Sequence, residues 1–191
     1  MKKKNYSLKS YFNSYSKELN NTFKNIDHNQ LLKIQNIIEQ KYQKKKNVFI
    51  CGNGGSSSIS NHWECDHREG IKRSNKFKPK AISLVSNTDI ITAIANDNGY
   101  EKIFSNSFDN LHEKDDLLIC FSVSGNSKNI INVMKLAKKR KIEIVFFGGF
   151  NGGAAKNYSD YKIIFRSKNF GIVEDCFQMI MHVLAQHIEK K

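Results

Sequence analysis

The sequence lacks the features of a membrane protein, a secreted protein or a chain of linked domains. No apolar run approaches the ~18 residues that a membrane-spanning helix requires, and the longest one, residues 142–150, contains Glu143. The basic residues 2–4 are not followed by an apolar stretch, so we expect no secretory signal and a location in the cytoplasm. Proline occurs once, at Pro79, and neither repeats nor a low-complexity linker interrupt the chain. This predicts a single domain with an N-terminal extension.

Cysteine and arginine are also scarce. The four cysteines include no C-x-x-C pair and are expected to be free, mostly buried thiols. The formal net charge is +13, but Arg, the usual reader of base edges, occurs only four times. The lysines are spread along the chain without an aromatic or Arg-rich motif, which disfavours nucleic-acid binding. A solvated Lys-rich surface is the preferred interpretation, and it would concentrate an anionic substrate such as a sugar phosphate.

The apolar content is sufficient for one folded domain. Hydrophobic residues make up 39% of the 191 positions and include 13 Phe and 7 Tyr, too many for a disordered chain. Residues 7–45 carry apolar side chains every three or four positions, which predicts one long or two shorter amphipathic helices with a break at 27–29. Such helices cannot bury an apolar face alone, so we expect region 1–45 to pack on the rest of the protein or on a neighbouring subunit.

The remaining residues, 46–191, alternate short apolar runs with helical patterns. Strands are predicted at 47–51, 81–85, 117–123, 144–147 and 161–165, and helices at 56–68, 89–95, 103–111, 129–140 and 173–189. The alternation, with strands that are apolar on both faces, predicts a three-layer α/β/α domain around a parallel sheet of about five strands. Ligands of such sheets bind beyond the carboxyl ends of the strands.

Two turns rich in glycine and serine follow predicted strands and lead into predicted helices. The first, C-G-N-G-G-S-S-S, spans residues 51–58, and the second, S-V-S-G-N-S, spans residues 122–127. Glycine lets the backbone approach a ligand, and the free N–H groups at a helix start favour an anion. The first turn is neither a Walker loop nor a dinucleotide fingerprint. A serine N-cap with a glycine turn is the ordinary alternative at each place, but two such turns on one sheet indicate a phosphate site.

Histidine and carboxylate side chains are paired on two of the predicted helices. His62 and Asp66 are four residues apart and share one helix face. Glu174 and His182 lie about 80° apart around the last helix. Together they could supply four ligands to a divalent metal, and zinc suits this donor set best. From spacing alone, a core or interface histidine with solvated acids is the favoured interpretation.

Three motifs in a fixed order resemble those of the sugar isomerase (SIS) family and, within it, the phosphoheptose isomerases. They are G-N-G-G-S at 52–56, N-D-N-G-Y-E-K-I-F at 96–104 and S-V-S-G-N-S-K-N at 122–129. The resemblance covers nearly the whole chain. It implies an intramolecular oxidoreductase that converts sedoheptulose 7-phosphate to a heptose 7-phosphate for surface-polysaccharide or nucleotide-sugar synthesis. It also implies zinc as a cofactor and a homotetramer.

The resemblance also implies roles for individual residues. Asp66 and His182 are the implied catalytic acid and base, in an order that stays open, and His67 is a further candidate. The implied metal ligands are His62, Asp66, Glu174 and His182. The implied substrate contacts are Asn53, Gly54, Gly55, Ser56, Asn96, Asp97, Ser122, Val123, Ser124, Ser127 and Glu174, with Ser122, Ser124 and Ser127 at the phosphate.

Two positions depart from the family pattern. Asp66 replaces a Glu and is one methylene shorter, and Glu174 replaces a Gln and so adds negative charge to any metal site. A non-catalytic SIS protein that binds a sugar phosphate or a protein partner as a regulator is the alternative function. The joint presence of His62, Asp66 and His182 argues against that alternative.

Overall fold

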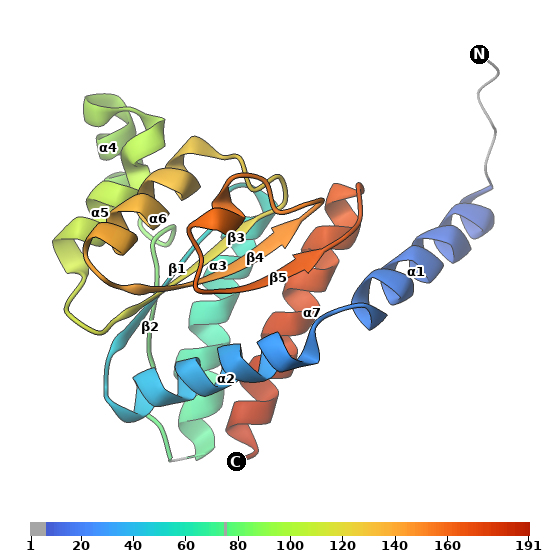
Figure 1. Cartoon of the computed structure of the whole chain (residues 1–191), viewed down its shortest axis with the longest axis horizontal. Coiled ribbons are helices and arrows are strands. Elements are labelled where there is room, and N and C mark those ends of the chain that lie inside the picture. Colours follow the sequence, from blue (N-terminus) through green and yellow to red (C-terminus); the bar gives the residue numbers. More distant parts are fainter. Residues whose placement is uncertain (1–6, 75) are drawn as a thin grey trace.

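A parallel five-stranded sheet forms the centre of the molecule. The computed structural model describes residues 7–74 and 76–191 (Figure 1). The strands are β1 (Asn47–Cys51), β2 (Lys80–Ser83), β3 (Leu117–Ser122), β4 (Glu143–Gly149) and β5 (Tyr161–Phe165). Their order is β2-β1-β3-β4-β5, and each neighbouring pair is parallel. The predicted fold class and strand number are confirmed.

Helices cover both faces of the sheet, as Figure 1 shows. One face packs on α2 (His28–Gln43), α3 (Gly55–Cys65) and α7 (Phe170–Glu189). The other packs on α5 (Ile103–Leu111) and α6 (Lys128–Lys139), with α4 (Thr88–Asn98) beside them. In β3, Ile119 and Phe121 belong to the first apolar core and Leu118 and Cys120 to the second. Successive side chains point to opposite faces of a strand, so a strand buried on both sides is apolar throughout.

Four short helical segments complete the described elements. A π-helical turn, Asp66–Gly70, continues α3, and 3-10 turns occupy Ile71–Ser74, Tyr100–Lys102 and Ala155–Asn157. The prediction of a single α-helix through 56–68 is therefore too long by one turn. Within the described residues, no helix is long and apolar enough to cross a membrane.

The N-terminal helical region consists of two helices. The sequence had predicted either one long helix or two shorter ones. Asp27 caps α2 by accepting hydrogen bonds from the backbone N–H groups of Asn29 and Gln30, so the second helix begins within the predicted break. The first helix, α1 (Leu8–Lys24), extends away from the sheet in Figure 1 and contacts α7. No residue of the described helix α1 is buried.

The strand order places the two glycine-rich turns side by side. Strand β2 lies on one side of β1, and the next strand in the chain, β3, lies on the other side. The direction of winding therefore reverses between β1 and β3. Their carboxyl ends, Cys51 and Ser122, are followed directly by the two turns. Ligands of open parallel sheets bind at such a switch point.

Candidate active site

The first turn brings the start of α3 very close to α7. Gly54 has a positive φ of 55°, a conformation that favours glycine. Gly55 begins α3, and a Cβ atom added to it would lie 2.5 Å from Oε2 of Glu174. The turn thus needs glycine at both positions, for conformation at the first and for space at the second.

Glu174 occupies the anion-binding end of α3. Its carboxylate, on the first part of α7, accepts a hydrogen bond from the backbone N–H of Ser56. Burial raises the pKa of Glu174 above its usual value, and the bond from Ser56 offsets part of this rise. A carboxylate of the protein itself therefore already lies at the helix start that follows the first turn.

The second turn leaves its helix start free for an external anion. Gly125 has a φ of 64°, and a Cβ atom there would meet the Gly152 carbonyl at 2.1 Å. Ser122 Oγ accepts from the Gly125 N–H at 3.1 Å, which fixes the turn. Ser127 is the N-cap of α6, but its hydroxyl makes no capping bond in this described helix. The Ile130 N–H already donates to Asn129 Oδ1 at 2.9 Å, so the N–H groups of Lys128 and Asn129 and the Ser127 hydroxyl are the donors that can bind a phosphate.

Both turns line one cavity of about 270 Å³ at the carboxyl edge of the sheet. The predicted substrate residues that line it are Asn53, Gly54, Gly55, Ser56, Ser122, Val123, Ser124, Ser127 and Glu174. Its described lining does not include Asn96 or Asp97, which lie near the end of α4 and bond to each other at 2.8 Å. The structure thus brings the two turns together and leaves the α4 pair outside this cavity.

An amide pair joins the two halves of this site. Asn53 and Asn129 exchange two hydrogen bonds of 2.9 Å between their side chains. Tyr100 adds a third bond by donating its hydroxyl to Oδ1 of Asn53 at 3.0 Å. Asn129 and Tyr100 were not predicted as site residues, although both belong to the quoted motifs.

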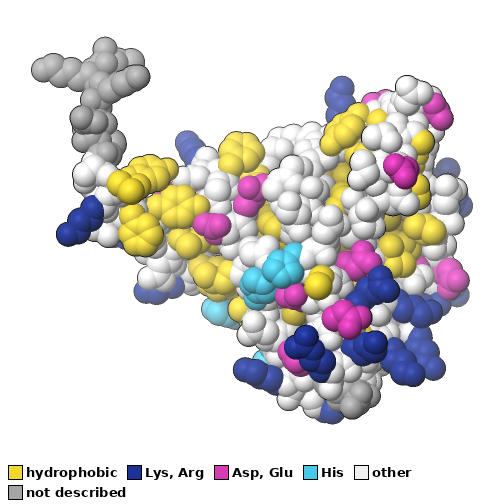
Figure 2. All heavy atoms as spheres, turned by 180° about the vertical axis from the view of Figure 1, so that it is seen from behind, with side chains coloured by type: hydrophobic (Ala, Val, Ile, Leu, Met, Phe, Trp, Pro, Cys, Tyr) yellow, Lys and Arg dark blue, Asp and Glu magenta, His cyan; other side chains and the backbone are white. Residues whose placement is uncertain are grey.

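Three of the four predicted metal ligands meet on the outer surface of α3 and α7. Asp66 Oδ1 lies 3.3 Å from His62 Nε2, and Asp66 Oδ2 lies 3.6 Å from His182 Nε2. The candidate ligand atoms all lie within 4.8 Å of one another. On the face shown in Figure 2, histidine side chains lie beside acidic ones, with Lys and Arg gathered below them. The group is accessible to a ligand, because each side chain is partly exposed.

Comparisons with known proteins identify the family of this chain. The model of the SIS domain matches residues 10–149. The chain belongs to the SIS domain family. It is 36% identical over 162 residues to a phosphoheptose isomerase of Clostridium acetobutylicum, covering 85% of this chain and 82% of that one. It is 34% identical over 186 residues to a phosphoheptose isomerase of Buchnera aphidicola, covering 95% and 94%.

Solved structures show the same fold for this SIS protein. A phosphoheptose isomerase from Francisella tularensis matches with a TM-score of 0.88 and 25% identity, covering 96% of this chain and 97% of that one. The phosphoheptose isomerase GmhA from Neisseria gonorrhoeae matches with a TM-score of 0.87 at 21% identity, covering 96% and 97%. The second likeness concerns the fold alone.

The spacing of the three side chains in this SIS protein suits zinc. Zinc binds His nitrogen and carboxylate oxygen at about 2.0–2.2 Å, so neighbouring ligand atoms of a tetrahedral site are about 3.3–3.6 Å apart. The distances from His62 Nε2 to Asp66 Oδ1, 3.3 Å, and from His182 Nε2 to Asp66 Oδ2, 3.6 Å, are of that size but involve different carboxylate oxygens. Within the described chain, Glu174 is not part of this group. Its carboxylate contacts Gly55 and Ser56 instead.

Gln178 is a site residue that the sequence interpretation missed. Its side-chain nitrogen lies 2.8 Å from His62 Nδ1 and 3.1 Å from His182 Nε2, so it touches both imidazoles. Gln178 is four residues before His182 and shares its helix face. That spacing is the signal in the sequence that could have identified it.

The interpretation of His67 as a further acid or base is wrong. His67 is fully buried, stacks on Trp63 with ring centroids 4.5 Å apart, and shares a 2.7 Å hydrogen bond with the Tyr42 hydroxyl. Burial lowers the pKa of His67 to about 3, so its ring is neutral at physiological pH. Asp66 and His67 are neighbours on a helical turn and therefore point in different directions, one toward the surface and one into the core.

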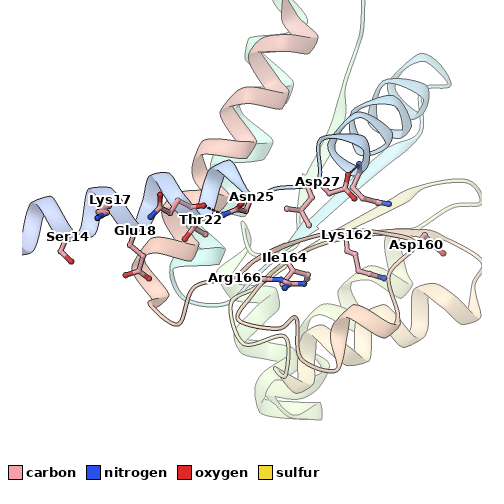
Figure 3. A pocket seen from close by; sticks show the side chains of 13 residues that line it. Ser14, Lys17, Glu18, Thr22, Asn25, Asp27, Asp160, Lys162, Ile164 and Arg166 are labelled. Carbon is pink, nitrogen blue, oxygen red and sulfur yellow. Dashed lines mark hydrogen bonds between the residues drawn. The ribbon is translucent and has the colours of Figure 1, made fainter.

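A larger cavity lies away from all the predicted site residues. It measures about 980 Å³ and lies between α1, the start of α2 and the edge strand β5 (Figure 3). Its charged lining residues are of both signs: Lys17, Glu18, Asp27, Asp160, Lys162 and Arg166. Helix α1, which has no buried residue, forms one wall of this cavity. The described lining includes no residue of the two glycine- and serine-rich turns. The smaller cavity is therefore the candidate substrate site.

Proposed function

We propose that this protein is an aldose–ketose isomerase that converts sedoheptulose 7-phosphate to a heptose 7-phosphate, an intramolecular oxidoreductase. The observation that carries the proposal is the single cavity that both turns line, with a free helix start on one side and Glu174 on the other. The relatives named phosphoheptose isomerase support the substrate. A role in surface-polysaccharide or nucleotide-sugar synthesis and a location in the cytoplasm remain predictions.

The phosphate of the substrate would bind at the second turn. The hydroxyls of Ser122, Ser124 and Ser127 and the first N–H groups of α6 supply donors there, and Glu174 would repel an anion from the start of α3. The sugar would then extend along α7 from Glu174 toward His182. These two residues are eight positions apart, or about 12 Å along the helix axis. An extended seven-carbon phosphate can cover such a length, and a three-carbon phosphate cannot.

Isomerisation moves a proton between C1 and C2 through an enediol, which requires a base, an acid and a donor to the developing oxyanion. Asp66 and His182 face each other at 3.6 Å and are the proposed acid–base pair. A zinc ion held by His62, Asp66 and His182 would polarise the sugar carbonyl and stabilise the oxyanion. Metal binding uses the lone pair of His182, so the two roles exclude each other in one complex. Among the described residues lining the cavity, Glu174 is then the titratable group left to move the proton.

We further propose a homotetramer in which residues 7–45 and α7 form interfaces. Leu8, Tyr11 and Phe12 of α1 are 83%, 54% and 66% exposed, an apolar surface that another subunit would cover. Met179 and Val183 of α7 are also exposed, beside the histidine group. Light scattering tests this proposal, and a stable monomer at micromolar concentration would contradict it.

The deciding experiment is incubation with sedoheptulose 7-phosphate followed by NMR of the sugar products. Parallel reactions contain added zinc or a chelator, because a metal-dependent reaction stops on chelation and an acid–base pair without metal does not. The Ser127→Ala variant is the matched control for phosphate binding, since it keeps the His and Asp group. If no aldose forms under any condition, the protein is not this isomerase. The regulator alternative would then predict sugar-phosphate binding without turnover.

A further inference from the structure

An exposed phenylalanine lines the candidate substrate cavity. Phe170 is the first residue of α7, is 57% exposed and lines the cavity together with Ser124 and Ser127. Two further apolar residues of the described lining, Phe121 and Val123, are buried. In small-molecule sites, polar groups fix the orientation of a ligand and apolar side chains cover its carbon atoms. The exposed ring of Phe170 is therefore available to an apolar part of the ligand.

The ring does not belong to a frayed helix end. Asn169 caps α7 by accepting hydrogen bonds from the N–H groups of Gly171 at 3.0 Å and Ile172 at 3.4 Å. The ring of Phe170 also packs nearly perpendicular to that of Phe150, with the centroids 5.1 Å apart and an interplanar angle of 88°. Aromatic pairs favour such an edge-to-face arrangement. These contacts restrict the ring before a ligand binds.

Phe150 belongs to a loop that is bonded to the second turn. Gly149, directly before it, donates its N–H to the Val123 carbonyl at 3.1 Å. Farther along the loop, the Ala154 N–H donates to Asn126 Oδ1 at 3.0 Å. Phe150 itself has a φ of 54°, a conformation that is unfavourable for a bulky residue and persists only where the surroundings hold it. The two rings therefore form a wall beside the turn that is proposed to bind phosphate.

The position of Phe170 along α7 places its ring at the phosphate end of the proposed sugar path. Glu174 follows four residues later on the same helix face, about 6 Å along the axis. His182 follows twelve residues later, about 18 Å along the axis. A sugar that extends from the second turn past Glu174 toward His182 would therefore pass Phe170 with the carbons next to its phosphate. The reacting carbons would lie far from the ring.

We propose that Phe170 determines which phosphate compounds this cavity accepts, by packing its ring against the C–H groups of the carbons next to the phosphate. A phenyl ring cannot form the hydrogen bonds that hydroxyls require, but its negative face attracts C–H groups. The same face repels a phosphate anion, which therefore stays at the serine turn. The ligand class is a phosphate ester of a hydroxylated carbon chain, in preference to free phosphate. This role of Phe170 rests on the proposed position of the phosphate but not on the isomerisation itself.

Binding of simple anions tests this contact without any reaction. Inorganic phosphate has no carbon, whereas glycerol 3-phosphate carries a short chain next to its phosphate. In Phe170→Ala, we expect the affinity for glycerol 3-phosphate and for sedoheptulose 7-phosphate to fall about 5–20-fold in NMR titrations, because the C–H groups lose the apolar surface that buries them. The affinity for inorganic phosphate should change less than about twofold, since it buries no apolar surface. Phe170→Tyr keeps the ring and should keep ester affinity within about threefold.

Two controls make the result specific. Leu111→Ala removes a similarly exposed apolar side chain at the end of α5, outside the described cavity lining, and should leave all three affinities unchanged. Light scattering shows whether Phe170 serves a subunit contact instead, and we expect the same mass for Phe170→Ala as for the unaltered chain. Circular dichroism checks that each variant is folded. In the isomerase assay, KM should rise by the same factor as the ester affinity falls while kcat stays within about twofold, because the ring is remote from His182.

Four results would overturn the proposal: no ester binding by the unaltered protein, unchanged affinity for either ester in a folded Phe170→Ala variant, an equal loss for inorganic phosphate, or a changed oligomeric mass. Each is independent of turnover. A protein whose ester affinity depends on Phe170 but that does not convert sedoheptulose 7-phosphate would refute the proposed reaction alone. An active isomerase whose KM is the same in Phe170→Ala would refute the role of Phe170 alone.

Discussion

The close contact between Gly55 and Glu174 allows a prediction that links stability to activity. In Gly55→Ala, the new Cβ would lie 2.5 and 2.6 Å from the two carboxylate oxygens. Comfortable contact needs about 3.5 Å, so the carboxylate must retreat by about 1 Å. A misplacement of that size can lower the rate of a reaction on the order of 100-fold. We expect such a loss in kcat with sedoheptulose 7-phosphate, measured by NMR.

The same change has two opposing effects on the free energy of unfolding. Alanine in place of glycine stabilises a helix by about 0.5–1 kcal/mol. Loss of the hydrogen bond from Ser56 to the charged Glu174 costs about 1.5–3 kcal/mol. The net result should be a destabilisation of about 1–2 kcal/mol, measured by urea unfolding.

A double-mutant cycle shows whether the contact is the cause. In a Glu174→Ala background the carboxylate is gone, so adding Gly55→Ala should stabilise the protein by about 0.5–1 kcal/mol. The sign of the effect of Gly55→Ala therefore reverses between the two backgrounds. If Gly55→Ala destabilises both backgrounds equally, the position of Glu174 described above is incorrect.

The remaining predictions concern chemistry, phosphate, pH and assembly. Asp66→Asn should lower the isomerisation rate about 100–10,000-fold, because an amide cannot accept the proton. Full activity in this variant would exclude Asp66 as the base. Asp66→Glu should raise turnover only if the shorter side chain of Asp66 limits the reaction. Loss of the hydroxyl in Ser124→Ala or Ser127→Ala should weaken sugar-phosphate binding about 10–100-fold by calorimetry, with little change in stability. The unfolded state protonates His67 below about pH 6.5, whereas the folded state keeps its ring neutral down to about pH 3. The free energy of unfolding should therefore fall as pH drops through that window, by up to about 1.4 kcal/mol per pH unit, and urea titrations of a His67→Gln variant should show a shallower slope. Phe12→Glu should dissociate the proposed tetramer in light scattering, and an unchanged mass would remove α1 from the interface.

The sequence predicted the sheet well because strands buried on both faces are apolar throughout. The predicted strand 161–165 coincides with β5, and the predicted break at 27–29 coincides with the N-cap at Asp27. The two turns could be placed together from topology alone, since carboxyl ends of parallel strands share one edge of the sheet. For the same reason, the cavity lining contained most of the predicted substrate residues.

Side-chain direction between helices could not be predicted in this way. Spacing shows that Glu174, Gln178 and His182 share one region of α7, but not which of them meets His62. That choice depends on the position of α3 against α7, where Glu174 contacts Gly55 and Gln178 contacts His62. The burial of His67 depends likewise on a π-helical turn that hydrophobic periodicity does not reveal.

The exchange of hydrogen bonds between Asn53 and Asn129 ties the first turn to helix α6 before any ligand arrives. The two residues are 76 positions apart in the chain, yet each satisfies the other, and Tyr100 holds the pair from a third segment. The loops that would contact a sugar phosphate therefore lose little conformational freedom on binding, so more of the interaction energy appears as affinity. Hydrogen exchange should accordingly be slow at the bonded Gly125 N–H in the free protein, whereas the first N–H groups of α6 should gain protection when a sugar phosphate is added.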